Sequence, residues 1–162
     1  MKNTKKAFKW IVGILNKHKI FFQISGGFAA KLYGSNRELN DIDFDIPEDK
    51  FGLLMPEIMP YITYGPDQYK DDKWDCYLIT LNFEGQEIDI CGLNNTKITT
   101  KDRKEWVPMK FDLSQAVKMN VFGLEVNVIN PQDLVGYKQN LDGKHQSEDI
   151  NAAEKYIQKM GL

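Results

Sequence analysis

Three aspartates alternate with apolar residues in one short segment of the sequence. Residues 41–46 read DIDFDI and are followed by Pro47. This period of two predicts a strand that carries its carboxylates on one face. Asp41 and Asp43 would then lie about 6.6 Å apart along the strand, so both could approach one divalent ion. Their oxygen atoms suit Mg²⁺, which usually completes its shell with water and substrate phosphates. The alternative is a solvated edge strand whose charges oppose aggregation.

A second segment can supply a third carboxylate. Residues 74–92 have the pattern of a hairpin with a two-residue turn, which pairs Thr80 with Asp89 on a polar face. If this hairpin lies beside residues 41–46, Asp89 joins the other two aspartates. Two metal ions held by such a set can stabilise both the attacking and the leaving oxygen of a phosphoryl transfer. The alternative for this face, which also carries Glu87, is simple solvation.

Two adjacent glycines precede the aspartates. Residues 20–24 are expected to form a short strand, and Gly26 and Gly27 lead directly into a helical pattern at 28–32. Because glycine has no side chain, backbone N–H groups at such a junction can approach a phosphate closely. A plain tight turn is the alternative. A phosphate cradle followed soon after by a metal pair is less easily explained by chance than either feature alone.

The other periodic segments complete one α+β domain. Residues 4–18 place apolar side chains at helical spacing, which predicts an amphipathic helix packed on a core. Asn130 and Pro131 are typical of a helix start, and Ser147 can cap a last helix. The remaining expected elements are a helix at 50–59, a hairpin with strands at 116–119 and 124–128, a helix at 131–141 and a helix at 147–160. Residues 1–162 are therefore expected to form a single domain with a helical C-terminal part at about 131–160.

Composition and charge favour a folded domain that does not bind nucleic acid through its overall field. The 162 residues are 42% hydrophobic and 27% charged, which is ordinary globular usage. The 21 lysine and arginine residues nearly balance 23 acidic residues, for a formal net charge of −2. Cys76 and Cys91 lack the spacing of a disulfide framework or a zinc site, which predicts buried, reduced thiols and a cytoplasmic location. No run approaches the roughly 18 apolar residues of a membrane span, so no membrane partner is expected.

The glycines and aspartates together resemble a known signature. Ile24-Ser25-Gly26-Gly27, then Arg37, then Asp41-Ile42-Asp43 is similar to the motif of the nucleotidyltransferase superfamily with the polymerase-beta-like fold. Small aminoglycoside and lincosamide nucleotidyltransferases and abortive-infection-type nucleotidyltransferases share this arrangement. The resemblance implies a mixed or antiparallel sheet flanked by helices, with further helices at the C-terminus.

The resemblance also implies roles for individual residues. Asp41 and Asp43 would bind one or two Mg²⁺ ions, and Asp89 would be the third carboxylate, acting as a metal ligand or as the general base on the acceptor hydroxyl. The triphosphate of an NTP would be held by Ser25, Gly26 and Gly27.

Three further residues follow from the same resemblance. Arg37 resembles an arginine found before the Asp-x-Asp pair, although a threonine often seen two residues later is Leu39 here. Lys138 lies on the apolar stripe of its predicted helix, where a lysine must reach water or a buried anion such as a phosphate. Lys138 is therefore a candidate nucleotide ligand. Asp149 resembles a later aspartate of the family whose role can be purely structural.

The activity implied is a Mg²⁺-dependent transfer of an NMP group from an NTP to an acceptor hydroxyl, with release of pyrophosphate. A small-molecule acceptor suits this short, acidic chain. Two alternatives remain open, namely a toxin–antitoxin type of enzyme acting on RNA or protein through the basic residues at 97–104, and a degenerate nucleotide-binding module. Many enzymes of this superfamily share a site between subunits, so the resemblance also implies a homodimer as a candidate assembly.

Overall fold

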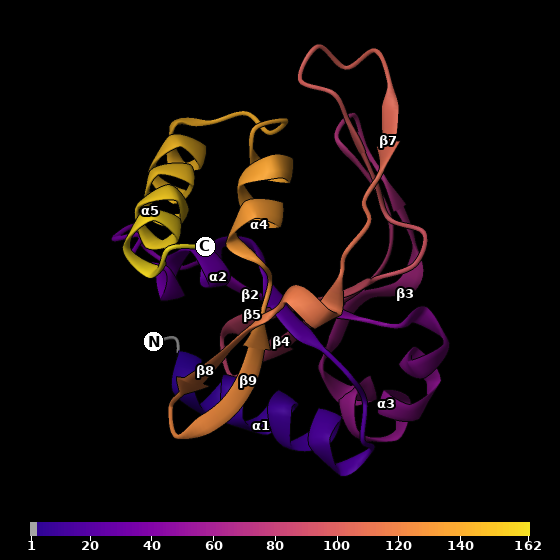
Figure 1. Cartoon of the computed structure of the whole chain (residues 1–162). Helices are drawn as coiled ribbons and strands as arrows, with labels where there is room; N and C mark the ends of the chain where they lie inside the picture. The colour runs from indigo at the N-terminus through magenta and orange to yellow at the C-terminus, as the bar shows by residue number, and fades with distance from the viewer. Residues whose placement is uncertain (1–2) are drawn as a thin grey trace.

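The computed structural model describes residues 3–162, which form a mixed α+β structure (Figure 1). Within these residues, nine strands form one sheet. The strands are β1 (Gln23–Ser25), β2 (Asp41–Ile46), β3 (Ile62–Lys70), β4 (Trp74–Phe83), β5 (Gln86–Gly92), β6 (Lys97–Thr99), β7 (Trp106–Pro108), β8 (Val117–Val121) and β9 (Leu124–Val128). The α-helices of the described chain are α1 (Thr4–Lys17), α2 (Gly26–Leu32), α3 (Phe51–Ile58), α4 (Pro131–Lys138) and α5 (Lys144–Met160).

The sheet is mostly antiparallel, with strand order β7-β6-β4-β5-β2-β1-β9-β8 and with β3 paired to β4. Parallel pairing joins β2 to β5 and β1 to β9. The expected mixed or antiparallel sheet flanked by helices is therefore confirmed. The strand that carries the three aspartates, β2, lies in the middle of the sheet, between β1 and β5.

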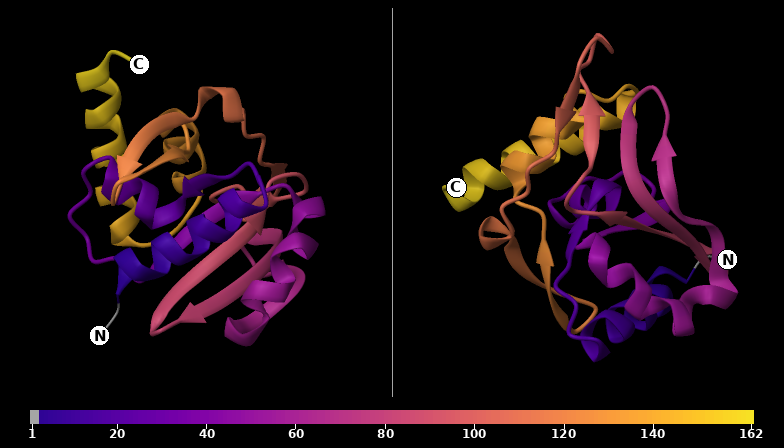
Figure 2. Two further views of the ribbon diagram at one scale, coloured as in Figure 1. Left: turned by 90° about the horizontal axis from the view of Figure 1, so that it is seen from below. Right: turned by 90° about the vertical axis from the view of Figure 1, so that its right-hand side faces the viewer.

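The apolar face of β2 forms the centre of the hydrophobic core. Ile42, Phe44 and Ile46 are fully buried, as the alternation of the sequence predicts. The helix α1 lies across this face (Figure 2, left), and its Phe8 stacks on Phe44 with 6.1 Å between ring centroids. Burying one such side chain stabilises the fold by roughly 1.5–3 kcal/mol. The core therefore occupies one face of β2 and leaves the carboxylates on the other.

Both predicted hairpins are present. Strands β4 and β5 pair Thr80 with Asp89, as expected. Their turn residues, Glu84 and Gly85, have φ values of 48° and 85°, which suit a tight two-residue turn. Strands β8 and β9 form the second hairpin, between residues 117 and 128. Local turn geometry therefore sets the register of both strand pairs.

Several element boundaries differ from the sequence expectation. The strand expected at 20–24 is the shorter β1, because the ladder with β2 begins only at Gln23 and Phe21 is 52% exposed. Helix α2 already begins at Gly26, α3 is preceded by a 3-10 turn, and α4 ends at Lys138 instead of 141.

The last helix, α5, begins earlier than expected, at Lys144, and the strands β3 and β6 are not among the predicted elements. The expected cap of the last helix, Ser147, lies inside α5, because Gly143 with φ 108° is the residue that precedes this helix. Strand β3 has an irregular pattern of exposed and half-buried residues, and β6 occupies part of the basic segment 97–104. Both strands depend on pairing with β4, which no local pattern shows.

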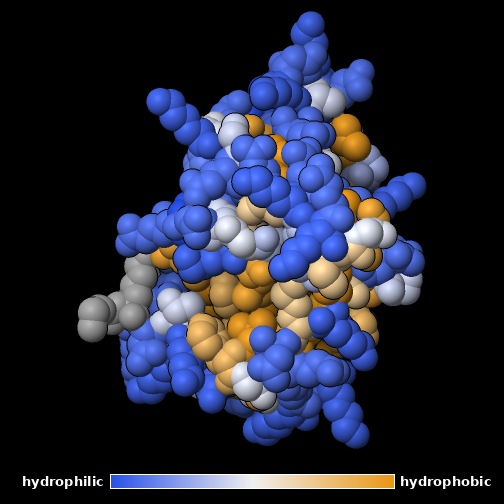
Figure 3. All heavy atoms as spheres, turned by 60° about the vertical axis from the view of Figure 1, so that its left-hand side comes forward, coloured by the Kyte–Doolittle hydropathy of each residue, from blue (hydrophilic) through white to orange (hydrophobic). Residues whose placement is uncertain are grey.

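The face of the molecule drawn in Figure 3 is mostly polar. In the view of Figure 3, hydrophilic side chains surround a smaller apolar area in the middle of the face. Among the helices in residues 3–162, none combines the length and the apolar character that a membrane crossing requires.

Candidate active site

The polar face of the sheet borders a cavity of about 500 Å³. Its floor includes Asp41, Asp43 and Asp89 of β2 and β5, beside Gly26 at the start of α2. Helices α4 and α5 lie on one side of this region, and the strands β3, β6 and β7 lie on the other (Figure 1; Figure 2, right). The cavity therefore brings together segments from most of the chain.

Three carboxylates converge at the floor of this cavity. The parallel register of β2 and β5 places Asp41 opposite Glu87, and Asp43 opposite Asp89. One carboxylate oxygen each from Asp41, Glu87 and Asp89 lies within 4.8 Å of the other two. This spacing and these hard oxygen donors fit a divalent cation such as Mg²⁺. Asp41 and Asp89 therefore lie close together, as predicted, and Glu87 lies beside them.

Asp43 lies beside this group but does not belong to the set of converging oxygens. Its carboxylate packs against Gly26, where an added Cβ would overlap it. Burial raises the pKa of Asp43 well above its ordinary value, and the charges of Asp41 and Asp89 raise it further. Burial likewise raises the pKa of Asp89 to about 6, although a hydrogen bond of 2.6 Å from the Thr80 hydroxyl opposes this rise. A cation bound here would relieve this repulsion.

The third aspartate of the DIDFDI segment has a different environment. Asp45 is buried and accepts hydrogen bonds from Gln23 Nε2 at 2.9 Å and from Ser25 Oγ at 3.1 Å. Burial raises its pKa to about 6, although these two bonds oppose the change. The sequence predicts that Ser25 helps to hold a triphosphate, but in this structure its hydroxyl is bound to Asp45. Both side chains therefore support the strand pair β1–β2.

The two glycines are required by close packing at the junction of β1 and α2. Gly26 has a φ of 60°, which side-chain-bearing residues rarely adopt, and it lies against Asp43. Its N–H donates to the hydroxyl of Tyr137 at 2.9 Å. At Gly27, an added Cβ would overlap the guanidinium of Arg37. The absence of side chains thus lets a carboxylate and a guanidinium approach the same stretch of backbone.

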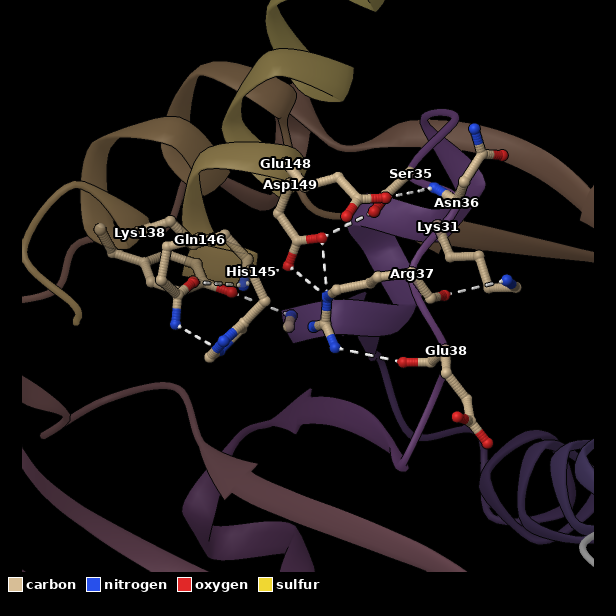
Figure 4. Close-up of polar contacts among 12 residues, drawn as sticks. Lys31, Ser35, Asn36, Arg37, Glu38, Lys138, His145, Gln146, Glu148 and Asp149 are labelled. Carbon is tan, nitrogen blue, oxygen red and sulfur yellow. Dashed lines mark hydrogen bonds and ion pairs between the residues drawn. The ribbon is translucent and has the colours of Figure 1, made fainter. Parts of the chain in front are cut away.

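A buried ion cluster lies next to this junction (Figure 4). Asp149 of α5 is fully buried and accepts bonds from Ser35 Oγ at 2.8 Å, Arg37 Nε at 2.8 Å and Lys138 Nζ at 3.0 Å. Burial opposes ionisation, yet the hydrogen bond from Arg37 and the charge of Lys138 hold the pKa of Asp149 below its ordinary value. The buried anion that Lys138 reaches in this structure is therefore Asp149. Arg37, with 18% of its side chain exposed, is an organised part of the site.

A polar chain continues from this cluster to the cavity. Lys138 Nζ donates to Gln146 Oε1 at 3.1 Å, and the Gln146 amide nitrogen lies 3.0 Å from a ring nitrogen of His145 (Figure 4). All three residues line the cavity. Gln146 and His145 were not predicted, because their place depends on how α5 packs against α4.

The opposite side of the cavity is largely apolar and aromatic. Its lining includes Tyr69, Trp74, Leu78, Met109 and Phe111. Both cysteines are free and also line the cavity. Both are expected to be buried, but Cys91 is only half-buried.

In the basic segment 97–104, Arg103 donates to Asn140 O at 2.6 Å and pairs with Asp142 at 2.7 Å. Arg103 thus connects the β6–β7 region to the loop between α4 and α5.

Similarity to known proteins is found in three-dimensional structure. Neither a protein-family model nor a curated protein sequence matches this chain. A protein from Thermotoga maritima, provisionally described as a nucleotidyltransferase, superposes with a TM-score of 0.65 at 15% identity, over 98% of this chain and 96% of its own. The lincosamide antibiotic adenylyltransferase LnuA, solved with lincomycin bound, superposes with a TM-score of 0.64 at 15% identity, over 96% of this chain and 99% of its own. The chain has the nucleotidyltransferase fold.

A third structure with the nucleotidyltransferase fold is ANT(2")-Ia in complex with adenylyl-2"-tobramycin. It superposes with a TM-score of 0.63 at 12% identity, over 99% of this chain and 91% of its own. The fold expected from the glycine and aspartate motifs is therefore confirmed. Within the nucleotidyltransferase fold of this chain, the two motifs meet at one cavity.

Proposed function

We propose that this protein is a nucleotidyltransferase that moves an NMP group from an NTP to a hydroxyl of a small molecule. The observation that carries the proposal is the convergence of Asp41, Glu87 and Asp89 beside the Gly26–Gly27 junction in one cavity. In the reaction, the acceptor oxygen forms a bond to the α-phosphorus and the bond from that phosphorus to the bridging oxygen breaks. Pyrophosphate leaves with that oxygen, and the hydroxyl proton passes to a carboxylate, for which Asp89 is the candidate.

Asp41 and Asp89, with Glu87, are the residues that would hold Mg²⁺, and Asp43 lies directly beside them. Bound Mg²⁺ would supply positive charge against the phosphate oxygens. The protein's own contribution is to position reactants, because phosphoryl transfer depends mainly on orientation and charge neutralisation. Removal of these carboxylates should therefore abolish transfer without unfolding the chain.

We assign the nucleotide phosphates to the Gly27 side of the glycine junction, where Arg37 lies, and not to the Gly26 side, where Asp43 lies. Arg37 and Lys138 share the single carboxylate of Asp149, so the buried cluster retains a net positive charge. This charge lies next to the glycine junction, where backbone can approach a ligand closely. Binding of a triphosphate there would place its charge beside the two cations.

The acceptor is assigned as a small molecule. LnuA is solved with lincomycin, and ANT(2")-Ia with adenylyl-2"-tobramycin, and the cavity here has an apolar wall suited to a compact ligand. Arg103 of the basic segment is already bonded within the protein, which weakens the case for an RNA or protein acceptor. ATP is the first NTP to test, because LnuA is an adenylyltransferase and ANT(2")-Ia is solved with an adenylylated product. NTP use and two free thiols also favour a cytoplasmic location.

Thermal unfolding with Mg²⁺ and each NTP tests the proposal. A ligand that binds only the folded state at about 100 times its Kd stabilises it by about 2.7 kcal/mol, so wild-type protein should show a raised Tm. The double variant Asp41→Asn/Asp89→Asn should fold but lose this rise, whereas Asp49→Asn, which changes an exposed carboxylate, should keep it. Acceptor-dependent release of pyrophosphate is then measured with the NTP that binds. No response to any NTP, or full release by the double variant, would refute the proposal.

A further inference from the structure

The hydroxyl of Tyr137 occupies an unusual place in this site. Tyr137 belongs to α4 and is 8% exposed, and its ring packs edge-to-face against Trp74 with centroids 5.8 Å apart. Its oxygen accepts the N–H of Gly26, which lies 111 residues earlier in the chain. The first N–H of the glycine junction is therefore used to hold a tyrosine hydroxyl. Both residues line the cavity.

The hydroxyl hydrogen of Tyr137 is left to interact with a ligand. A tyrosine hydroxyl has one hydrogen to donate, and the Gly26 N–H occupies one of its acceptor positions. Among residues 3–162, no oxygen or nitrogen accepts a hydrogen bond from this hydroxyl in the structure. By contrast, Tyr33 is also buried, with 5% exposed, and its hydroxyl donates to the carbonyl of Ile129 at 2.5 Å. Tyr33 thus has a structural acceptor, whereas Tyr137 lines the cavity and has no acceptor among the described residues.

Given the nucleotide site proposed above, on which this inference rests, we propose that the Tyr137 hydroxyl donates a hydrogen bond to an oxygen of the nucleotide's phosphate chain. The N–H of Gly26 fixes the hydroxyl oxygen, and Trp74 fixes the ring, so the donor is in place before the ligand arrives. Arg37 and Lys138 supply charge nearby. Unlike these two cations, the Tyr137 hydroxyl is neutral and has a single hydrogen to donate. The Gly26 N–H acts through Tyr137 as a positioning group.

Binding of phosphate compounds to matched tyrosine variants tests this assignment. Tripolyphosphate with Mg²⁺ is the probe for the phosphate chain alone, and the NTP that binds wild-type protein is the second ligand. Tyr137→Phe keeps the ring and removes the donor, so it should bind both ligands about 10-fold more weakly and raise the KM for the NTP. Tyr33→Phe should lose stability but bind both ligands as wild-type protein does. Urea unfolding of each variant confirms that it is folded.

Each outcome decides between the two proposals. If wild-type protein binds both ligands and Tyr137→Phe binds them equally well, the role of Tyr137 is overturned and the nucleotide site stands. An equal loss of binding in Tyr33→Phe would likewise overturn it, because general destabilisation would then explain the effect. If wild-type protein binds neither ligand, both proposals fail. If Tyr137→Phe fails to fold, the same measurements are made with Tyr137→His, whose ring N–H lies closer to the backbone than the tyrosine hydroxyl and should not reach the phosphate chain. Binding by Tyr137→His as tight as that of wild-type protein would overturn the role of Tyr137.

Discussion

Replacement of Asp45 by asparagine should stabilise the protein at neutral pH and leave it unchanged in acid. Asp45 is buried, and its pKa in the folded chain is raised to about 6 from an ordinary value of 3.8. Its charged form is therefore disfavoured in the folded protein. An asparagine carries no charge and has almost the same shape. Gln23 can turn its amide to accept from the new N–H₂ group, while Ser25 continues to donate to the oxygen.

The magnitude follows from the two pKa values. Below 3.8 the carboxyl is neutral in both states, so its contribution to stability is fully present there. As pH rises, the unfolded chain loses this proton first, and the free energy of unfolding falls until the folded form also ionises near 6. A pKa difference of this size corresponds to about 3 kcal/mol. Asp45→Asn should therefore gain about 1–3 kcal/mol at about pH 7.5.

Urea unfolding of wild-type protein and Asp45→Asn over a range of pH measures this difference. Asp49→Asn is the control, because its carboxylate is exposed and the free energy of unfolding should change little at any pH. Mg²⁺-dependent NTP binding by Asp45→Asn should be retained, since Asp45 lies outside the converging carboxylates. A gain that does not depend on pH, or a loss of stability at neutral pH, would refute the assignment of Asp45 as a buried carboxyl with a raised pKa.

Two further substitutions test the packing around the site. Gly26→Ala should destabilise the protein and abolish NTP binding, because its Cβ would overlap Asp43 and because its φ is 60°. The control is Gly123→Ala, which has a φ of 89° but open space around the Cβ, so it measures only the backbone cost of about 1–2 kcal/mol. Equal losses of stability for the two variants in urea unfolding would show that the overlap with Asp43 has no effect. Asp149→Asn should cost about 3–5 kcal/mol in urea unfolding by leaving Arg37 and Lys138 without a buried anion, and a loss below about 1 kcal/mol would show that they do not need it.

The carboxylate-bearing strand and its neighbouring hairpin could be predicted from the sequence because their causes are local. A period of two decides which residues of β2 face the core, and a two-residue turn decides that Thr80 lies opposite Asp89. The glycine and aspartate motifs also indicate the nucleotidyltransferase fold. Those features depend on residues that are close together in the chain.

The remaining parts of the site depend on packing between distant segments. The parallel pairing of β2 with β5 decides that Glu87 joins Asp41 and Asp89, and no local pattern specifies that pairing. Likewise, the packing of α4 and α5 against the start of α2 brings Tyr137 to Gly26, across 111 residues. The sequence alone thus determined which residue types were available and which faces they share. Which of them meet follows from the packing of whole elements, because contacts between distant segments depend on how those elements are placed relative to one another.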